Sequence, residues 1–147
     1  MEELRGGADV VLKKIMRQAA AERASDVHIE PGASFVRVRF RKDGLLSDRF
    51  CLSSSMAPNL SVRVKVLGRL DVGESRLPQD GSWAEEIDGV PYDFRISVLP
   101  SMYGETIVIR ILSGRVNFIE KNELGMRKEQ EALFRRALSK GQGLILT

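Results

Sequence analysis

A stretch of strictly alternating residues limits the folds that this chain can adopt. In the sequence VRVRFR, valine or phenylalanine occupies positions 36, 38 and 40, and arginine occupies positions 37, 39 and 41. Side chains of a β-strand point alternately to its two faces, so the pattern predicts a strand with one buried face and one charged face. The next residues, Asp43-Gly44, predict a tight hairpin turn, and LLSDRFCLS is the expected return strand.

Further segments predict a mixture of helices and strands. Helical spacing of apolar residues predicts a helix capped by Asp9 and a second helix from Met56 to Leu70, with Lys65 on its outer face. Further strands are expected at DVHIEP, SWAEEID, YDFRISV and ETIVIRIL, a last helix in MRKEQEALFRRALSKG, and a short buried strand in GLILT. The expected fold class is α/β (α+β), with an antiparallel sheet of about six strands flanked by helices.

Composition excludes several classes of protein. The 147 residues, 43% of them hydrophobic, suffice for one ordinary core, and the net charge of +3 is far below that of a dedicated nucleic-acid binder. Cys51 is the single cysteine, which excludes an intrachain disulfide and favours a reducing, cytoplasmic compartment. The sequence contains neither an apolar run of about 20 residues nor the apolar core of a signal peptide, so direct membrane insertion is not expected.

The sequence offers no convincing metal or nucleophile site. His28 and Glu30 form an H-x-E pair, but the P-C-x-x-C partner motif of zinc deaminases is missing. A hydrogen-bonded strand residue is the expected role of His28. RLPQDG, residues 76–81, is expected to form a fixed turn in which Asp80 caps the turn and Gly81 takes a positive φ.

Two arginines are predicted to meet on one face of the sheet. In YDFRISV the apolar positions leave Arg95 on the polar face, and in ETIVIRIL they leave Arg110 there. If LPSMYG joins the two strands as a hairpin, the period of two forces both arginines onto the same face. Neighbouring guanidiniums repel each other unless a carboxylate or a bound anion lies between them. Asp93 is the expected carboxylate partner if the pair has only a structural role.

A series of motifs resembles a known family. ASDVHIEP, VRVRFRKDG, RLPQDG, DFRISVLPSMYGE, IRIL, LGM and GLILT occur in the order and at the spacing found in the secretion ATPases of type II secretion and type IV pilus assembly. The resemblance covers about residues 24–147. It implies an N-terminal PAS-like domain that ends just before the Gly-rich phosphate loop, so the chain alone is not expected to be catalytic whereas its full-length parent is expected to be an ATPase.

The resemblance also implies an organisation and a mode of action. Residues 1–24 are expected to form an N-terminal amphipathic helix, 25–125 the PAS-like coupling domain, and 126–147 a connecting helix with the first strand of a motor domain. In the family six subunits form a ring, and arginines of the N-terminal domain reach the phosphates of bound ATP when the two domains close. By position these arginines correspond to Arg95 and Arg110, which are thus the expected catalytic and cofactor-binding residues.

The expected cofactors and partners follow from the same resemblance. ATP and Mg²⁺ are expected in the full-length protein only, and no resident metal is expected in this chain. The expected partners are the motor domain, neighbouring subunits of a hexamer and proteins of an inner-membrane secretion or pilus platform, through which a cytoplasmic protein would lie at the membrane. The chain departs from the family pattern at Ser82 and Thr106, where the family usually has arginine, so any contribution of those two arginines is missing here.

Two hypotheses of a different functional class stay open. The chain could be an autonomous PAS-like module that binds a ligand or a protein and has no role in ATP hydrolysis. Alternatively, Arg37, Arg39 and Arg41 could bind nucleic acid weakly, although few aromatic residues accompany them for base stacking.

Overall fold

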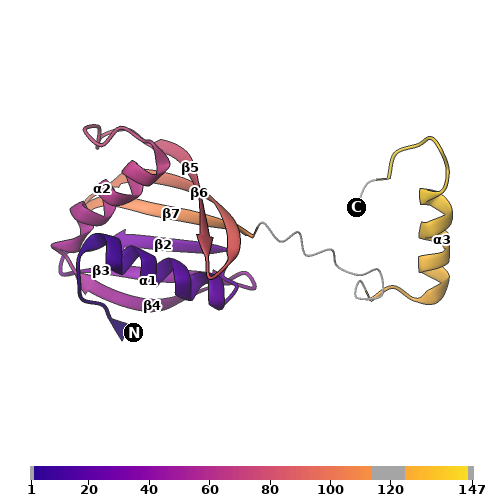
Figure 1. Ribbon diagram of the computed structural model, residues 1–147, viewed down its shortest axis with the longest axis horizontal. Coiled ribbons are helices and arrows are strands. Elements are labelled where there is room, and N and C mark those ends of the chain that lie inside the picture. The colour runs from indigo at the N-terminus through magenta and orange to yellow at the C-terminus, as the bar shows by residue number, and fades with distance from the viewer. Residues whose placement is uncertain (1, 114–124, 146–147) are drawn as a thin grey trace. The chain divides into compact units, whose positions relative to one another are not determined.

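The computed structural model describes residues 2–113 and 125–145 (Figure 1). The chain divides into two compact units, Met1–Arg115 and Val116–Thr147. The boundaries expected after residues 24 and 125 stay predictions.

The first unit contains a seven-stranded sheet and two helices. Its elements are β1 (Glu2–Glu3), α1 (Ala8–Ala21), β2 (Asp26–Pro31), β3 (Phe35–Lys42), β4 (Leu45–Ser53), α2 (Met56–Gly68), β5 (Gln79–Ile87), β6 (Val90–Ser101) and β7 (Gly104–Ser113). The order in the sheet is β1-β4-β3-β2-β7-β6-β5, and β2 to β7 pair only antiparallel. The predicted α+β class with about six antiparallel strands is therefore confirmed, and the two-residue β1, parallel to β4, is an addition.

Asp-Gly pairs turn two of the hairpins. Asp43 and Gly44 join β3 to β4 with φ values of 50° and 80°, and Asp88 and Gly89 join β5 to β6 with 50° and 78°. Such left-handed pairs match the right-handed twist of the flanking strands. The predicted turn at Asp43-Gly44 is confirmed.

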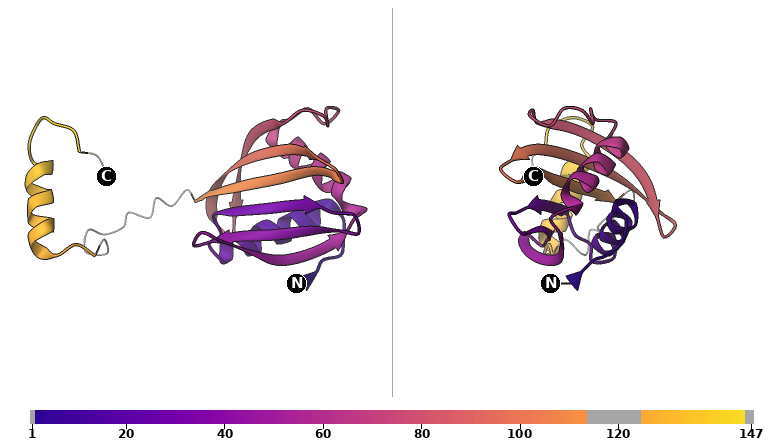
Figure 2. Two further views of the ribbon diagram at one scale, coloured as in Figure 1. Left: turned by 180° about the vertical axis from the view of Figure 1, so that it is seen from behind. Right: turned by 90° about the vertical axis from the view of Figure 1, so that its left-hand side faces the viewer.

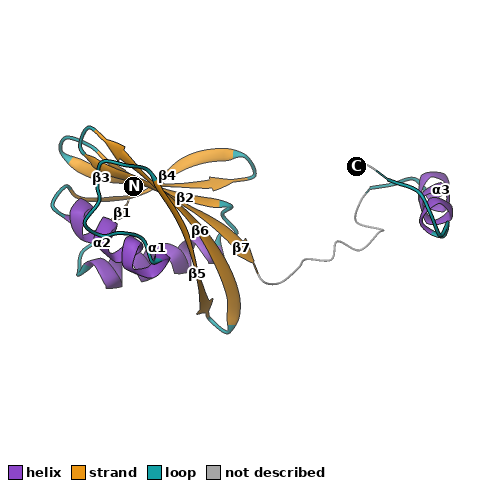
Figure 3. Ribbon diagram, turned by 90° about the horizontal axis from the view of Figure 1, so that it is seen from above, coloured by secondary structure: helices purple, strands orange, loops and turns teal. Residues whose placement is uncertain are grey.

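The two helices cover one face of the sheet and leave the other open. Seen from above, α1 and α2 lie on the same side of the strands (Figure 3). The view from behind shows the opposite face of the sheet, on which no helix of the described part of this unit lies (Figure 2). The buried core lies between the helices and the sheet, and its members include Ile15, Ala19, Val27, Val38, Phe40, Phe50, Leu60, Val64, Phe94, Ile96 and Ile109. The alternation in the strands therefore has the expected cause: apolar residues face the helices, and arginines face away.

Both helices of the first unit begin without a side-chain cap. Gly7 is the N-cap residue of α1, and Asp9 lies in the first turn, so the predicted cap at Asp9 is wrong. A carboxylate there still lies near the positive end of the helix dipole. Helix α2 stops at Gly68 rather than at Leu70, because Arg69 takes the left-handed conformation at φ 56°.

Strand β5 begins earlier than the sequence indicates. Gln79, Asp80 and Gly81 pair with Val98, Ser97 and Ile96 of β6, so the predicted turn over residues 76–81 is wrong in its second half. Gly81 does not have a positive φ. Glycine is needed at this position because the strand lies close to α2: a Cβ at residue 81 would lie 2.6 Å from the carbonyl oxygen of Gly68 at the end of α2.

The second unit contains helix α3 (Lys128–Leu138), close to the last predicted helix. The sequence predicts that Leu133 and Leu138 face inward, but within the described part of the unit they are 66% and 51% exposed. Gly143–Ile145 form neither strand nor helix, and Leu146 and Thr147, the end of the predicted strand, lie outside the described residues.

Candidate functional site

Arg95 and Arg110 lie directly opposite each other on β6 and β7. The hairpin that joins these strands turns at Ser101–Gly104, as the parity argument assumed. Both arginines are exposed on the open face of the sheet. Directly opposed residues have Cβ atoms about 4.5–5.5 Å apart, so the two positive charges are near neighbours. The predicted juxtaposition is thus confirmed, whereas the role of the pair is a separate question.

The two arginines line a shallow hollow of about 330 Å³ on this face. The other lining residues are Asp80, Gly81, Ile96, Ser97 and Val108. Asp80 accepts a hydrogen bond of 2.6 Å from the hydroxyl of Ser97, so this carboxylate is already engaged on the side of β5. A hollow with two guanidiniums and one engaged carboxylate has a net positive charge, which suits an anion with several oxygens.

The two arginines differ in their partners. Arg110 donates from Nε to Oδ1 of Asp26 at 3.1 Å, across the β2–β7 pair. Arg95 has no hydrogen bond or ion pair within residues 2–113 and 125–145. Asp93, the expected carboxylate partner, pairs in register with Leu112 and Ala84 and bonds to neither arginine. The expectation for Asp93 is therefore wrong, because the strand order places Asp26 beside Arg110 instead.

The arginines of β3 on the open face contact neighbouring residues of the sheet. Arg39 donates to Glu30, and the Nε of Arg41 lies 3.5 Å from Oδ2 of Asp26. The guanidinium carbon of Arg37 lies 5.7 Å from the ring centre of Phe35, a cation–π distance. The carboxylates of Glu30 and Asp26 thus offset the charges of Arg39 and Arg41, which does not favour the hypothesis of nucleic-acid binding by Arg37, Arg39 and Arg41.

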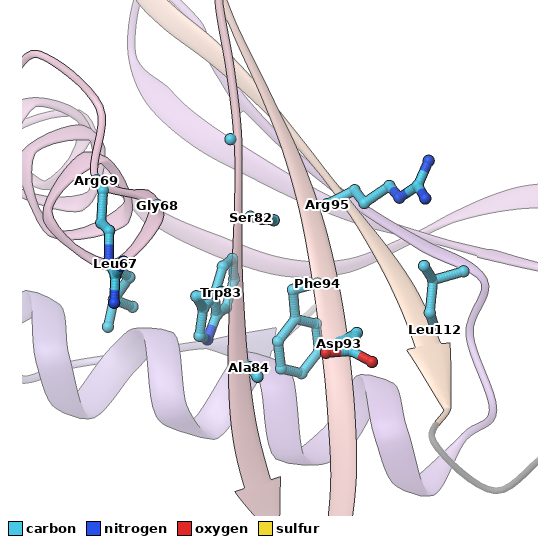
Figure 4. Close-up of a pocket in the computed structure, with 11 residues that line it drawn as sticks. Leu67, Gly68, Arg69, Ser82, Trp83, Ala84, Asp93, Phe94, Arg95 and Leu112 are labelled. Atoms are coloured by element: carbon cyan, nitrogen blue, oxygen red, sulfur yellow. The ribbon is translucent and has the colours of Figure 1, made fainter.

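A larger hollow of about 790 Å³ borders strand β5 (Figure 4). In this view Leu67 and Arg69 lie on one side of β5, and Arg95 lies on the other. Trp83 stacks on Phe94 with ring centres 4.5 Å apart, and Trp83 is only 9% exposed. The aromatic rings therefore belong to the core, and little of their surface is available to a ligand.

A buried ionic cluster lies beneath the β6–β7 hairpin. The Nζ atom of Lys65 lies 2.6 Å from Oε1 of Glu105 and donates to the carbonyl oxygen of Glu74 at 2.6 Å. The hydroxyl of Ser61, one turn earlier on α2, donates to the other oxygen of Glu105. Lys65 is 1% exposed, so its predicted outer position is wrong. Sequence reasoning missed this position because a lysine at that helical spacing is usually a surface residue.

His28 lies on β2 and is partly buried. Its Nδ1 lies 3.9 Å from Glu30, and its Nε2 is buried without a hydrogen-bond partner in the described part of the chain. Burial lowers the pKa of this imidazole; Arg41 and Arg39 act in the same direction, and Glu30 and Asp26 oppose it. His28 is therefore neutral at pH 7. The described residues contain no cluster of three or more His, Cys, Asp or Glu side chains that could hold a metal ion.

Comparison with known sequences shows a clear relationship. Residues 5–147 match the family described as Type II/IV secretion system protein. The chain is 42% identical over 136 residues to the protein transport protein HofB homolog of Escherichia coli, 36% identical to the type II secretion system ATPase E of Vibrio cholerae, and 37% identical to the type IV pilus assembly ATPase PilB of Acinetobacter baylyi. These matches cover 92%, 92% and 99% of this chain but only 30%, 27% and 26% of the relatives.

Comparison of structures supports the fold. The ATPase DotB of Legionella pneumophila superposes with a TM-score of 0.52 at 16% sequence identity, over 76% of this chain and 31% of that chain. At this identity the similarity concerns the fold alone. Within the described residues no helix has both the length and the apolar character to cross a membrane.

Proposed function

Because the chain belongs to the Type II/IV secretion system protein family, we propose that it is the N-terminal coupling domain of a secretion or pilus-assembly motor ATPase. Since it spans less than a third of its relatives, the catalytic centre would lie in other parts of a longer protein. In this proposal Arg95 and Arg110 contact the phosphates of ATP when the domains close. The observation that carries it is the pair of exposed guanidiniums at one hollow, one of them without a carboxylate partner in the described part of the chain.

The chemistry of the hollow fits a phosphate group. Guanidinium groups are planar, stay charged at any physiological pH, and can bond two phosphate oxygens at once. Negative charge spreads over the oxygens of a phosphoryl group as it is transferred, and an arginine placed there stabilises that charge. Because Arg95 has no partner in residues 2–113 and 125–145, its guanidinium can make such a contact without breaking an ion pair of this part of the chain. Mg²⁺, which these motors require, would be bound with the nucleotide and not by this chain.

The same contact would couple nucleotide state to movement. An arginine that bonds phosphate only in the closed arrangement favours closure when ATP is bound and releases it after hydrolysis. Repeated around a hexamer, this closure would move each coupling domain against a motor domain. The domain would then pass the movement to a secretion or pilus platform at the inner membrane, with the protein itself on the cytoplasmic side.

An autonomous binding module is the second candidate. The hollow of about 790 Å³ beside β5 is the observation in its favour. If the chain is such a module, the isolated chain should bind a small ligand tightly, and substitutions at Arg95 should not change ATP turnover of the full-length parent.

The test of the proposed function is steady-state ATP hydrolysis by the full-length parent. Arg95→Gln should lower kcat by at least about tenfold, since arginine fingers elsewhere contribute about 10³–10⁵ in rate. Arg37→Gln is the matched control, because Arg37 is exposed on the same face but outside the hollow. Wild-type kcat in Arg95→Gln and in Arg110→Gln would exclude a phosphate role for the pair.

A further inference from the structure

Asp26 lies between two arginines in one row across the sheet. It pairs in register with Arg41 of β3 on one side and with Arg110 of β7 on the other. Its Oδ1 accepts from Nε of Arg110 at 3.1 Å, and its Oδ2 lies 3.5 Å from Nε of Arg41. The side chain of Asp26 is 9% exposed, whereas that of Arg110 is 65% exposed. The carboxylate is thus the buried member of a pair whose other member reaches into solvent.

The carboxylate of Asp26 is held in place. The hydroxyl of Ser25 donates to Oδ2 at 2.9 Å, and Arg41 and Arg110 approach from opposite sides. A buried carboxylate is stable only when its oxygens are bonded in this way. Because it is bonded on both oxygens, it provides a fixed anchor for the inner end of the Arg110 guanidinium.

The terminal amino groups of Arg110 are available for a ligand. The bond to Asp26 uses Nε alone, and the two terminal amino groups have no partner among the described residues. Arg110 lines the same hollow as Arg95. Arg95 has no anchor of this kind among the described residues. The hollow therefore combines one tethered arginine with one untethered arginine.

We propose that Asp26 is a positioning residue that orients Arg110 for phosphate, while Arg95 is the arginine that reorients during closure. This inference rests on the proposed function of the arginine pair. Groups that are oriented before reaction contribute more to rate than groups that must be ordered during it. Charge neutralisation alone does not require the bond to fall on Nε, and this bond leaves the terminal amino groups without a partner among the described residues.

The kinetic test is a double-mutant cycle in the full-length parent with Asp26→Asn and Arg110→Gln. If Asp26 acts through Arg110, Asp26→Asn lowers kcat about five- to tenfold with KM for ATP within about twofold, and the double variant is no slower than Arg110→Gln alone. Multiplicative losses in the double variant would overturn the inference. Arg39→Gln is the matched control: Arg39 lies on the neighbouring strand β3 and pairs with Glu30 instead of Asp26, so its loss should leave kcat within about twofold of wild type.

A second variant, Asp26→Glu, separates an effect on orientation from loss of the charge or of the fold. Asp26→Glu keeps the charge but displaces the carboxylate by one methylene, so it should still lower kcat if orientation matters. Wild-type kcat in Asp26→Glu would show that only charge matters and would overturn the inference. If Arg110→Gln itself leaves kcat unchanged while Arg95→Gln lowers it, the positioning role of Asp26 fails and the proposed function survives through Arg95.

A measurement on the unsubstituted chain is independent of any variant. In NMR spectra of the 147-residue chain, the Nε proton of Arg110 should exchange with water at least about tenfold more slowly than that of Arg95, because only the first is hydrogen-bonded. Equal exchange rates for the two protons would contradict a tethered Arg110. Addition of pyrophosphate should shift the Arg95 signal more than the Arg37 signal, and equal shifts would contradict an untethered arginine that is ready to bind.

Discussion

Arg95 and Arg110 face each other across β6 and β7, yet among the described residues only Arg110 has a carboxylate within hydrogen-bonding distance, Asp26 at 3.1 Å. Two like charges in register destabilise a sheet unless something compensates them. Asp26 compensates Arg110 and shares its charge with Arg41. No carboxylate among the described residues compensates the positive charge of Arg95, as expected of a group that binds an anion.

The first prediction concerns stability of the two arginine variants. Arg95→Gln should leave the melting temperature of the chain unchanged or raise it, because it removes repulsion and breaks no bond of the described residues. Arg110→Gln should lower the free energy of unfolding by about 1 kcal/mol or more, because Asp26 loses the closer of its two arginine partners. Thermal melts of the two variants side by side measure the difference. Equal destabilisation by both would mean that Arg95 also has a structural partner.

The second prediction concerns the buried lysine. Lys65→Met should destabilise the chain by about 3–5 kcal/mol, because Glu105 would remain as a buried carboxylate without its cation. Adding Glu105→Gln should recover part of the loss. The control is Lys13→Met, which breaks an exposed pair with Asp9 and should leave the stability nearly unchanged. Urea unfolding of the three variants provides the values, and a mild effect of Lys65→Met would show that the pair is not buried.

The third prediction concerns pH. Burial lowers the pKa of His28 below its usual 6.5 in the folded state. The unfolded state therefore binds the extra proton first as pH falls, so the folded state loses stability below about pH 6.5 and the imidazole has no effect above it. The unfolding free energies of wild type and His28→Gln are measured at about pH 7.5 and about pH 5. The stability of His28→Gln relative to wild type should be higher at the lower pH. A constant difference between the two pH values would contradict the lowered pKa.

The fourth prediction concerns the contact between α2 and β5. Gly81→Ala would place a methyl group 2.6 Å from the carbonyl oxygen of Gly68, so it should destabilise the chain by about 1–3 kcal/mol. Gly73→Ala is the control, because its nearest neighbour would be the Asp71 carboxylate at an ordinary 3.4 Å. Thermal melts that rank the two variants in the opposite order would contradict the close approach.

Much of the sheet is predictable from the sequence because each of the strands β2 to β7 has a local signature. Alternation predicts the face of each side chain, and a hairpin through LPSMYG then places Arg95 and Arg110 together from the sequence of β6 and β7 alone. Asp26 cannot be placed there in the same way. It reaches Arg110 only because β2 pairs with β7, which is 84 residues away along the chain.

Two other errors have the same physical origin. Lys65 is placed outside by its helical spacing, and only the fold brings Glu105, 40 residues later, beneath it. Gly81 has the composition of a turn residue, but it lies within a strand that α2 approaches closely. Both positions are determined by contacts between distant segments, which local propensity does not contain.

The structure of the full-length parent with a non-hydrolysable ATP analogue tests the central claim most directly. The quantity is the distance from the guanidinium nitrogens of Arg95 and Arg110 to the nearest oxygen of the terminal phosphate. In a closed subunit we expect at least one of them at about 2.7–2.9 Å, the range of a charge-assisted hydrogen bond. If both guanidiniums stay beyond about 5 Å from every phosphate oxygen in all subunits, with no water between them, the phosphate role of the pair is contradicted.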